Sequence, residues 1–363
     1  MATSVGSCAS RNRGVRRRHV SAVLIAVWLG ATATVAADPT DDLVRAQMKR
    51  QRIPGLALAV VKDGVVIKTE GYGVADRKTA VPVTPDTVFK IASVSKQFMA
   101  TGIMLLVQDG RVRLDDDVRR YLPDVPASWA GITVRHLLSH TSGLPRGAPG
   151  WTTASSNDAE DIRSAYPVPL RFAPGTKWEY SNLGYTVLAE IIARVSGRSW
   201  PEFMTERVFR PAGMLATRTT TVTEPVPNRA SGYTDNDRLL EAPDWAAVRP
   251  SGGFLSTVRD LARWDAVLYG DSILREASRR AMWTATTLAD GSSALYGFGW
   301  IINRPGARRQ VWHSGDLPGF KAQLRRYLDD RVTVIVLINL DDADDDAIAA
   351  GVAELYLPDR SSR

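Results

Sequence analysis

Short runs of apolar and often β-branched residues occur near both ends of the chain and predict strands there. Residues 55–61 read as a strand, and the turn Lys62-Asp63-Gly64 leads into a second arm at residues 65–69, so a β-hairpin is expected. Strand-like runs return late in the chain, at residues 296–302, 310–313, 322–328 and 331–339. We therefore expect one antiparallel sheet to which both ends of the chain contribute.

Helical spacing of apolar residues dominates the rest of the chain. Residues 88–108 are predicted to be mainly helical, with Ser93 opening the helix and Gly110 ending it. Further helices are expected at residues 41–51, 134–139, 185–195 and 344–357. The fold class is therefore α/β, an antiparallel sheet flanked by helices. Its sheet region would comprise residues 38–110 and 231–363, and residues 111–230, rich in Pro and Gly turns, would form a mainly helical insertion.

The first 37 residues have the pattern of a secretory signal peptide. Five arginines precede an uncharged run at residues 20–37, which ends in the small residues Val35-Ala36-Ala37. An uncleaved membrane anchor is the alternative, but Gly, Ala and Thr after Leu29 make this run a poor one. We expect cleavage and a periplasmic or secreted protein, and Arg17-Arg18 leaves twin-arginine export open beside the general pathway.

Charge and cysteine content change once this leader is set aside. The whole chain carries +7, but five of its 46 basic residues and no acidic residue lie in the leader, leaving 41 basic against 39 acidic residues. A nucleic-acid partner is therefore not indicated. The single cysteine, Cys8, lies in the leader, and His136, His140 and His313 lack the spacing of a zinc hydrolase, so neither a metal nor another cofactor is expected.

Ser93-Val94-Ser95-Lys96 is the first candidate for chemistry. At this spacing on a helix both Ser93 and Lys96 lie on one face, where an amine can take the serine proton. The lysine can do so only if its pKa falls toward neutrality, and burial acts in that direction. A single Ser-x-x-Lys match has roughly an even chance of occurring in a chain of this composition, so other motifs must support it.

Two further motifs follow in order. Tyr180-Ser181-Asn182 supplies a phenol, whose pKa a neighbouring ammonium can lower, and an amide that can orient both a lysine and a substrate carbonyl. His313-Ser314-Gly315 stands at the end of a strand-like run. There a basic residue and a hydroxyl can hold a substrate carboxylate or carbonyl, and the glycine lets the substrate backbone approach closely.

Together these motifs resemble the serine β-lactamase and penicillin-binding protein superfamily. The likeness is greatest to the class C β-lactamase branch, with its esterases, D-aminopeptidases and D-alanyl-D-alanine carboxypeptidases. Three other stretches are similar to recurring segments of that branch, and the resemblance covers about residues 41–357. These stretches are Leu137-Leu138-Ser139-His140-Thr141-Ser142-Gly143-Leu144-Pro145, residues 251–261 and Tyr296-Gly297-Phe298-Gly299-Trp300.

The resemblance implies a role for each matching residue. Ser93 would be the nucleophile of an acyl-enzyme, and Lys96 and Tyr180 would share the acid and base work. The substrate would be bound by Asn182, His313, Ser314, Gly315 and the backbone N–H of Asp316, which together with that of Ser93 would form the oxyanion hole. His136 and His140 match no catalytic position and are assigned to local structure.

His313 is a departure from the class C pattern, which typically has lysine at that place. Lysine is a permanent cation suited to a carboxylate, whereas histidine is mostly neutral at pH 7. We therefore favour hydrolysis of an ester or of a D-amino-acid amide or peptide over efficient hydrolysis of a β-lactam.

Two other interpretations stay open. An α/β-hydrolase with His313 as base would need Gly-x-Ser-x-Gly, and no serine here has that frame. A catalytically silent penicillin-binding or sensor protein of the same fold is the other. In either case the partner would be a small molecule or peptide, with no stable membrane insertion after the leader is removed.

Overall fold

The computed structural model describes residues 38–150, 157–219, 225–234, 240–241, 250–305 and 308–359, together with Ala9 and Arg238. The chain divides into two units, residues 1–37 and 38–363, and the described helices and strands all belong to the second. Apart from Ala9, the predicted signal peptide lies outside the described residues. Among the helices of the described part, none has the length and apolar content needed to span a bilayer.

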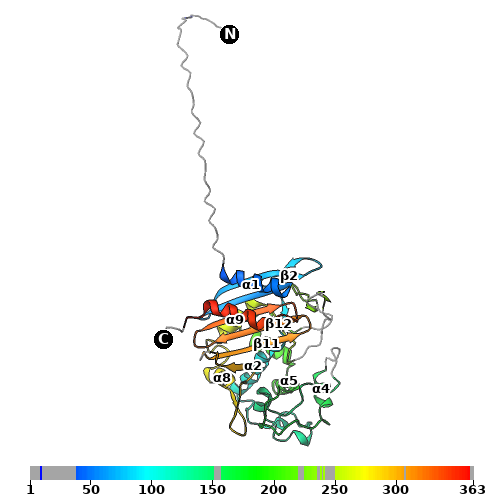
Figure 1. Ribbon diagram of the computed structural model, residues 1–363. Coiled ribbons are helices and arrows are strands. Elements are labelled where there is room, and N and C mark those ends of the chain that lie inside the picture. The colour runs from blue at the N-terminus through cyan, green and yellow to red at the C-terminus, as the bar shows by residue number, and fades with distance from the viewer. Residues whose placement is uncertain are drawn as a thin grey trace, which may run out of the picture. The chain divides into compact units, whose positions relative to one another are not determined.

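A seven-stranded antiparallel sheet joins the two ends of this unit (Figure 1). Its centre is the pairing of β1 with β13, in which Leu56 lies opposite Ile338. The sheet thus confirms the expected α/β fold class. In spatial order its strands are β10 (Ile301–Asn303), β11 (Gln310–Leu317), β12 (Phe320–Tyr327), β13 (Val332–Ile338), β1 (Gly55–Lys62), β2 (Val65–Asp76) and β3 (Val81–Pro82).

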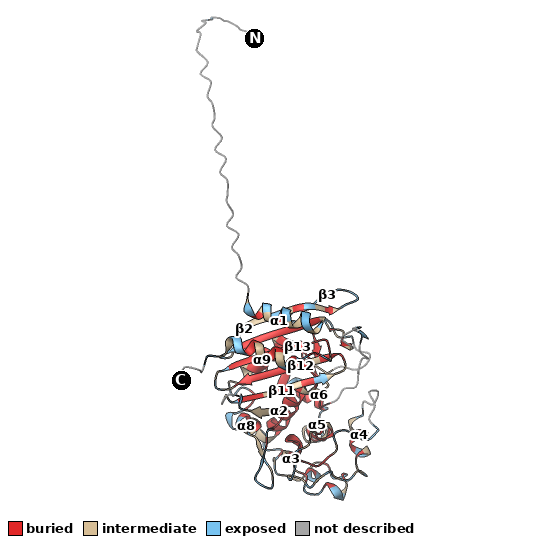
Figure 2. Cartoon of the chain, in the orientation of Figure 1, coloured by how far each residue is buried: buried red, intermediate tan, exposed pale blue. Residues whose placement is uncertain are grey.

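Helices cover both faces of the sheet, which explains the nearly continuous apolar runs of its central strands. Leu58 and Val60 pack on one side with residues of α1 (Pro39–Gln51) and α9 (Asp345–Tyr356). Ala57 and Ala59 face the other side, toward α2 (Ser95–Gln108) and α7 (Val258–Val267). Figure 2 shows these strands buried along most of their length.

The described residues between 111 and 219 form helices and turns. The helices are α3 (Val134–Leu138), α4 (Asp158–Ser164), α5 (Asn182–Ser196) and α6 (Trp200–Met204), which continues into a π-helical segment, Thr205–Phe209; 3₁₀ turns lie at Val118–Arg120 and Ala127–Trp129. α8 (Glu276–Met282) comes later. Short paired strands complete the unit: β4 (Phe89–Lys90) with β7 (Leu255–Ser256), β5 (Tyr233–Thr234) with β6 (Leu240–Glu241), and β8 (Thr286–Thr287) with β9 (Ser293–Ala294). The division at residues 111 and 230 stays a prediction.

Three local expectations were wrong. Ser93 does not cap a helix; it lies in a 3₁₀ turn, Ala92–Val94, because pairing of β4 with β7 keeps the preceding residues extended. Tyr296–Trp300 is not a strand, since Gly299 has a φ of 76° and a Cβ there would lie 2.7 Å from the Lys96 carbonyl oxygen. Finally, β11 runs on to Leu317, so His313 lies inside a strand and not at its end.

Candidate active site

The turn that carries Ser93 is held in an unusual conformation. Ala92 has a φ of 46°, in the left-handed region that residues with a Cβ rarely adopt. Backbone and side-chain bonds fix both flanks: the Ile91 N–H donates to the Phe254 carbonyl (3.1 Å), and the Phe254 N–H donates to Ser95 Oγ (3.2 Å). Strain of this kind persists only where the surroundings enforce it, and it is common at functional sites.

Lys96 lies in the first turn of α2 and is fully buried. Its Nζ donates to Ser93 Oγ (3.1 Å) and to the Ser251 carbonyl oxygen (2.7 Å). Burial, and secondarily the positive charge of Arg146, hold the pKa of Lys96 well below its usual 10.5. Both acceptors are neutral, so the site favours the uncharged amine, the form that can take a proton.

Tyr180 contacts the same hydroxyl. Its OH donates to Ser93 Oγ (2.8 Å), and Lys96 Nζ lies 4.7 Å from the centre of its ring. Burial raises the pKa of Tyr180, and this outweighs the hydrogen bond with Ser93 and the charge of Arg146. The expected lowering of this pKa by the neighbouring lysine is therefore wrong, and the phenol stays protonated.

His140 supports Tyr180, although sequence reasoning gave it only a local role. The ring is buried, lies 4.4 Å from the Tyr180 ring, and accepts the Ser181 N–H through Nδ1 (3.1 Å). Because Nδ1 is an acceptor, the neutral ring carries its proton on Nε2, which has no hydrogen-bond partner among the described residues. Burial is the main cause that holds the pKa of His140 well below 6.5.

His313 is buried between two polar partners. Nδ1 lies 2.7 Å from the Ser314 carbonyl oxygen, which can only accept, so Nε2 accepts the Tyr296 hydroxyl at 3.0 Å. Burial is the main cause that lowers the pKa of His313 to about 3. The residue that stands where class C enzymes have a cation is therefore a neutral imidazole at physiological pH.

The other predicted site residues are Asn182, Ser314, Gly315 and Asp316, and their contacts differ from those of Lys96 and Tyr180. Asn182 begins α5, and its Oδ1 is buried without a hydrogen-bond partner in the described part of the chain, so the expected contact with Lys96 is not formed. A Cβ on Gly315 would lie 2.2 Å from the Ile91 carbonyl oxygen, which requires glycine where β11 passes the Ser93 turn. Ser314 pairs with Gln323 in the sheet, and the Asp316 carboxylate lies 3.0 Å from Lys321 Nζ.

Several residues of this cluster were not predicted, yet most of them lie in the family-like stretches. Ser251 begins one of these stretches, Tyr296 begins another, and His140 lies within the third. Arg146 directly follows the His140 stretch, and its guanidinium lies 5.4 Å from the centre of the Tyr180 ring. The signal was therefore present as a resemblance, but no spacing along the chain indicates that these segments meet around Ser93.

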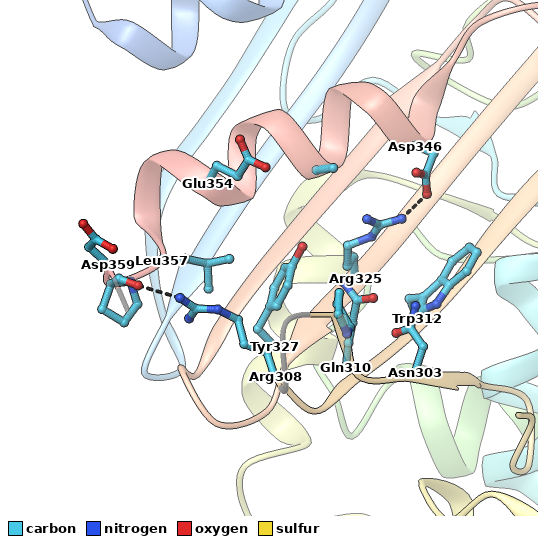
Figure 3. Close-up of a pocket in the computed structure, with 13 residues that line it drawn as sticks. Asn303, Arg308, Gln310, Trp312, Arg325, Tyr327, Asp346, Glu354, Leu357 and Asp359 are labelled. Atoms are coloured by element: carbon cyan, nitrogen blue, oxygen red, sulfur yellow. Dashed lines mark hydrogen bonds and ion pairs between the residues drawn. The ribbon is translucent and has the colours of Figure 1, made fainter. Parts of the chain in front are cut away.

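Two cavities differ in their relation to this cluster. One of about 440 Å³ is lined by Arg146, Asn182 and Ser251 among others, and so adjoins it. Another of about 810 Å³ lies where β10, β11 and β12 meet α9 and contains none of the predicted site residues. Figure 3 shows Trp312 and Arg325 on its wall, with Arg325 paired to Asp346 of α9.

The fold and the arrangement of motifs define a protein of the β-lactamase and penicillin-binding protein class. The chain belongs to the Beta-lactamase family, whose model matches residues 40–357. It is 34% identical to penicillin-binding protein 4* of Bacillus subtilis over 80% of this chain and 69% of that protein. It is 27% identical to protein Flp of Staphylococcus aureus over 83% of this chain and 62% of that protein.

Solved structures agree with this assignment. An octameric penicillin-binding protein homologue from Pyrococcus abyssi superposes with a TM-score of 0.78 at 28% identity, covering 87% of this chain and 76% of that one. D-amino acid amidase from Ochrobactrum anthropi SV3 superposes with a TM-score of 0.72 at 27% identity, covering 86% of this chain and 96% of that one.

Proposed function

We propose that the protein is an exported serine hydrolase that forms an acyl-enzyme on Ser93. The observation that carries this proposal is the pair of contacts to Ser93 Oγ, from Lys96 Nζ at 3.1 Å and from the Tyr180 OH at 2.8 Å. A hydroxyl between a buried amine and a protonated phenol has a base on one side and an acid on the other. The relatives include both penicillin-binding proteins and an amidase, so the geometry of the site must indicate the substrate.

The chemistry follows from these two protonation states. Ser93 Oγ attacks the substrate carbonyl carbon as its proton passes to the Lys96 amine, and the new C–O bond gives a tetrahedral intermediate. The leaving oxygen or nitrogen then takes a proton from Tyr180, the bond to it breaks, and the Lys96 ammonium returns a proton to the phenolate. Water repeats the sequence on the acyl-enzyme, with the same two groups restoring the free serine.

An ester or a D-amino-acid amide or peptide is the proposed substrate class, in preference to a β-lactam. The neutral His313 supports this, because it cannot act as the fixed cation that a penicillin carboxylate would meet in the class C pattern. The likeness to D-amino acid amidase at 27% identity supports the amide in particular. We expect short-chain ester hydrolysis with little or no turnover of nitrocefin.

Replacing the nucleophile tests the proposal. Ser93→Ala in residues 38–363 should abolish hydrolysis of p-nitrophenyl acetate and labelling by a fluorophosphonate, while the circular dichroism spectrum stays native. Ser95→Ala is the matched control. Ser95 Oγ accepts the Phe254 N–H, so this variant should lose stability but keep fluorophosphonate labelling. Turnover that survives in Ser93→Ala would refute Ser93 as the nucleophile.

A catalytically silent penicillin-binding or sensor protein is the second candidate. The specific observation behind it is the likeness to penicillin-binding protein 4* at 34% identity. A fluorophosphonate separates the two, because a hydrolase is acylated at Ser93 and a pure binding protein stays unlabelled. A protein that fluorescent penicillin labels and that never releases the acyl group would instead support penicillin sensing.

Export is proposed from the leader alone. Expression of the full chain in a bacterial host should deliver a protein that begins near Asp38 to the periplasm or medium. An intact N-terminus in the membrane fraction would favour the anchor instead.

A further inference from the structure

The proposed active site lacks a cation at the third motif. His313 is buried, and both its ring nitrogens already have oxygen partners, Ser314 and Tyr296. It can neither carry charge at physiological pH nor turn a free nitrogen toward a ligand without breaking a buried hydrogen bond. Lys96 is fully buried and is engaged with Ser93.

Arg146 is a second cation near Tyr180. Its side chain is exposed, its guanidinium lies 5.4 Å from the Tyr180 ring centre, and its charge acts on Lys96. In the described part of the chain no carboxylate forms an ion pair with it. The backbone of Arg146 is held by a hydrogen bond, in which its carbonyl oxygen accepts the Asn182 N–H (2.7 Å) at the start of α5. A fixed backbone with an open guanidinium is suited to binding an anion.

The cavity of about 440 Å³ beside Ser251 combines this cation with an unused acceptor. Asn182 Oδ1 is buried there without a partner among the described residues. Asp161 also lines the cavity, but it is buried and has interactions of its own. Beside the cavity there are therefore an exposed guanidinium and a buried amide oxygen without a partner among the described residues, which match a carboxylate and an N–H on one ligand.

We propose that Arg146 is the anion-binding residue of this active site and that the preferred substrates carry a carboxylate that it binds. The inference rests on the proposed function and specifies its substrate class. Arg146 would supply the cation from the segment that follows α3, and not from the third motif, where a penicillin carboxylate would still meet the neutral His313.

Paired esters test this assignment. One pair is p-nitrophenyl hydrogen adipate and p-nitrophenyl hexanoate, which differ in a carboxylate on the acyl side; the other is 3-acetoxybenzoate and its methyl ester, which differ in one on the leaving group. The readout is the ratio of kcat/KM for the anionic ester to that for the neutral ester, measured on the pH plateau of each variant.

Arg146→Gln should lower this ratio about tenfold in the pair whose carboxylate faces Arg146, as loss of a charge-assisted hydrogen bond predicts. Arg146→Lys should keep most of the wild-type preference for the anionic ester. The matched control is Arg45→Gln, because Arg45 is also exposed and lies 5.9 Å from a tyrosine ring, that of Tyr72, but belongs to α1. This control should leave both ratios unchanged.

A ratio that stays within threefold of the wild type in both pairs of esters would overturn the assignment of Arg146. The proposed function fails separately, if Ser93→Ala still hydrolyses p-nitrophenyl hexanoate. If Ser93→Ala is inactive while the ratio does not respond to Arg146→Gln, only the anion-binding role is wrong.

Discussion

Burial acts in opposite directions on the two groups that contact Ser93. It stabilises the neutral amine of Lys96 and the neutral phenol of Tyr180, lowering one pKa and raising the other. The motifs did not indicate which of Lys96 and Tyr180 is the base and which is the acid. Desolvation favours a neutral amine, which can take a proton, and a neutral phenol, which can give one. We therefore propose Lys96 as the base and Tyr180 as the acid.

The pH dependence of turnover follows from the Lys96 amine. Activity needs the neutral form, so kcat/KM should rise with pH through the pKa of Lys96, on a limb that lies well below 10.5. Arg146 contributes to the low pKa, so Arg146→Gln makes the ammonium easier to form and moves the limb to higher pH. Arg45→Gln should not move it. A limb that shifts to lower pH would contradict lysine as the base.

His140 should affect turnover through Tyr180 and not by touching substrate. His140→Phe keeps a ring against Tyr180 but leaves the buried Ser181 N–H without an acceptor, at a cost of about 1–3 kcal/mol. We expect kcat for ester hydrolysis to fall while KM changes little. Urea unfolding of the same variant measures the loss of stability.

His136 provides the matched control for this prediction. Its Nδ1 also accepts one backbone N–H, that of Thr133 (3.2 Å), at the start of α3. His136→Phe should cost stability and leave kcat near the wild-type value. Equal losses of kcat in both variants would show that the effect of His140 is general destabilisation.

At the scale of elements, the reactive turn depends on how closely β11 passes it. A methyl group on Gly315 would meet the Ile91 carbonyl oxygen at 2.2 Å, so either β11 or the Ser93 turn must move. Overpacking of this kind typically costs about 1–3 kcal/mol. Gly315→Ala should therefore slow fluorophosphonate labelling of Ser93 at least tenfold in a protein that still folds, whereas Gly270→Ala, where nothing lies within 4 Å of the new methyl, should label normally. Unchanged labelling of Gly315→Ala would show that the turn is not held by this contact.

At the scale of the whole molecule, local pattern predicts the sheet better than the site. Residues 55–69 and 322–339 carry enough β-branched and apolar character to indicate their strands, and both lie in the sheet. Helical spacing could not indicate that Ser93 precedes its helix, because the pairing of Phe89 with Ser256 decides where that helix begins. Contacts such as that of Lys96 with Ser251 join residues 155 positions apart, which no local pattern encodes.

One buried ion pair connects the sheet with the helical layer beneath it. Arg326 of β12 lies 3.0 Å from Asp265 of α7, both are buried, and the Thr333 hydroxyl of β13 donates to the same carboxylate (2.7 Å). Removing one partner of such a pair leaves the other charge buried, at a cost of about 3–5 kcal/mol. Asp265→Asn should therefore lower the free energy of unfolding by that amount in urea titrations, and labelling of Ser93 should persist where the protein is folded.

An exposed ion pair gives the contrast that makes this prediction specific. Arg259 of α7 pairs with Asp86 at 2.7 Å, and the two side chains are 42% and 59% exposed. Asp86→Asn should change the free energy of unfolding by less than about 1 kcal/mol, because solvent screens the charges before and after the substitution. If the two Asn variants unfold at the same urea concentration, the Asp265–Arg326 pair does not hold α7 to the sheet, and apolar contacts such as those of Leu261 and Ile335 must do so alone.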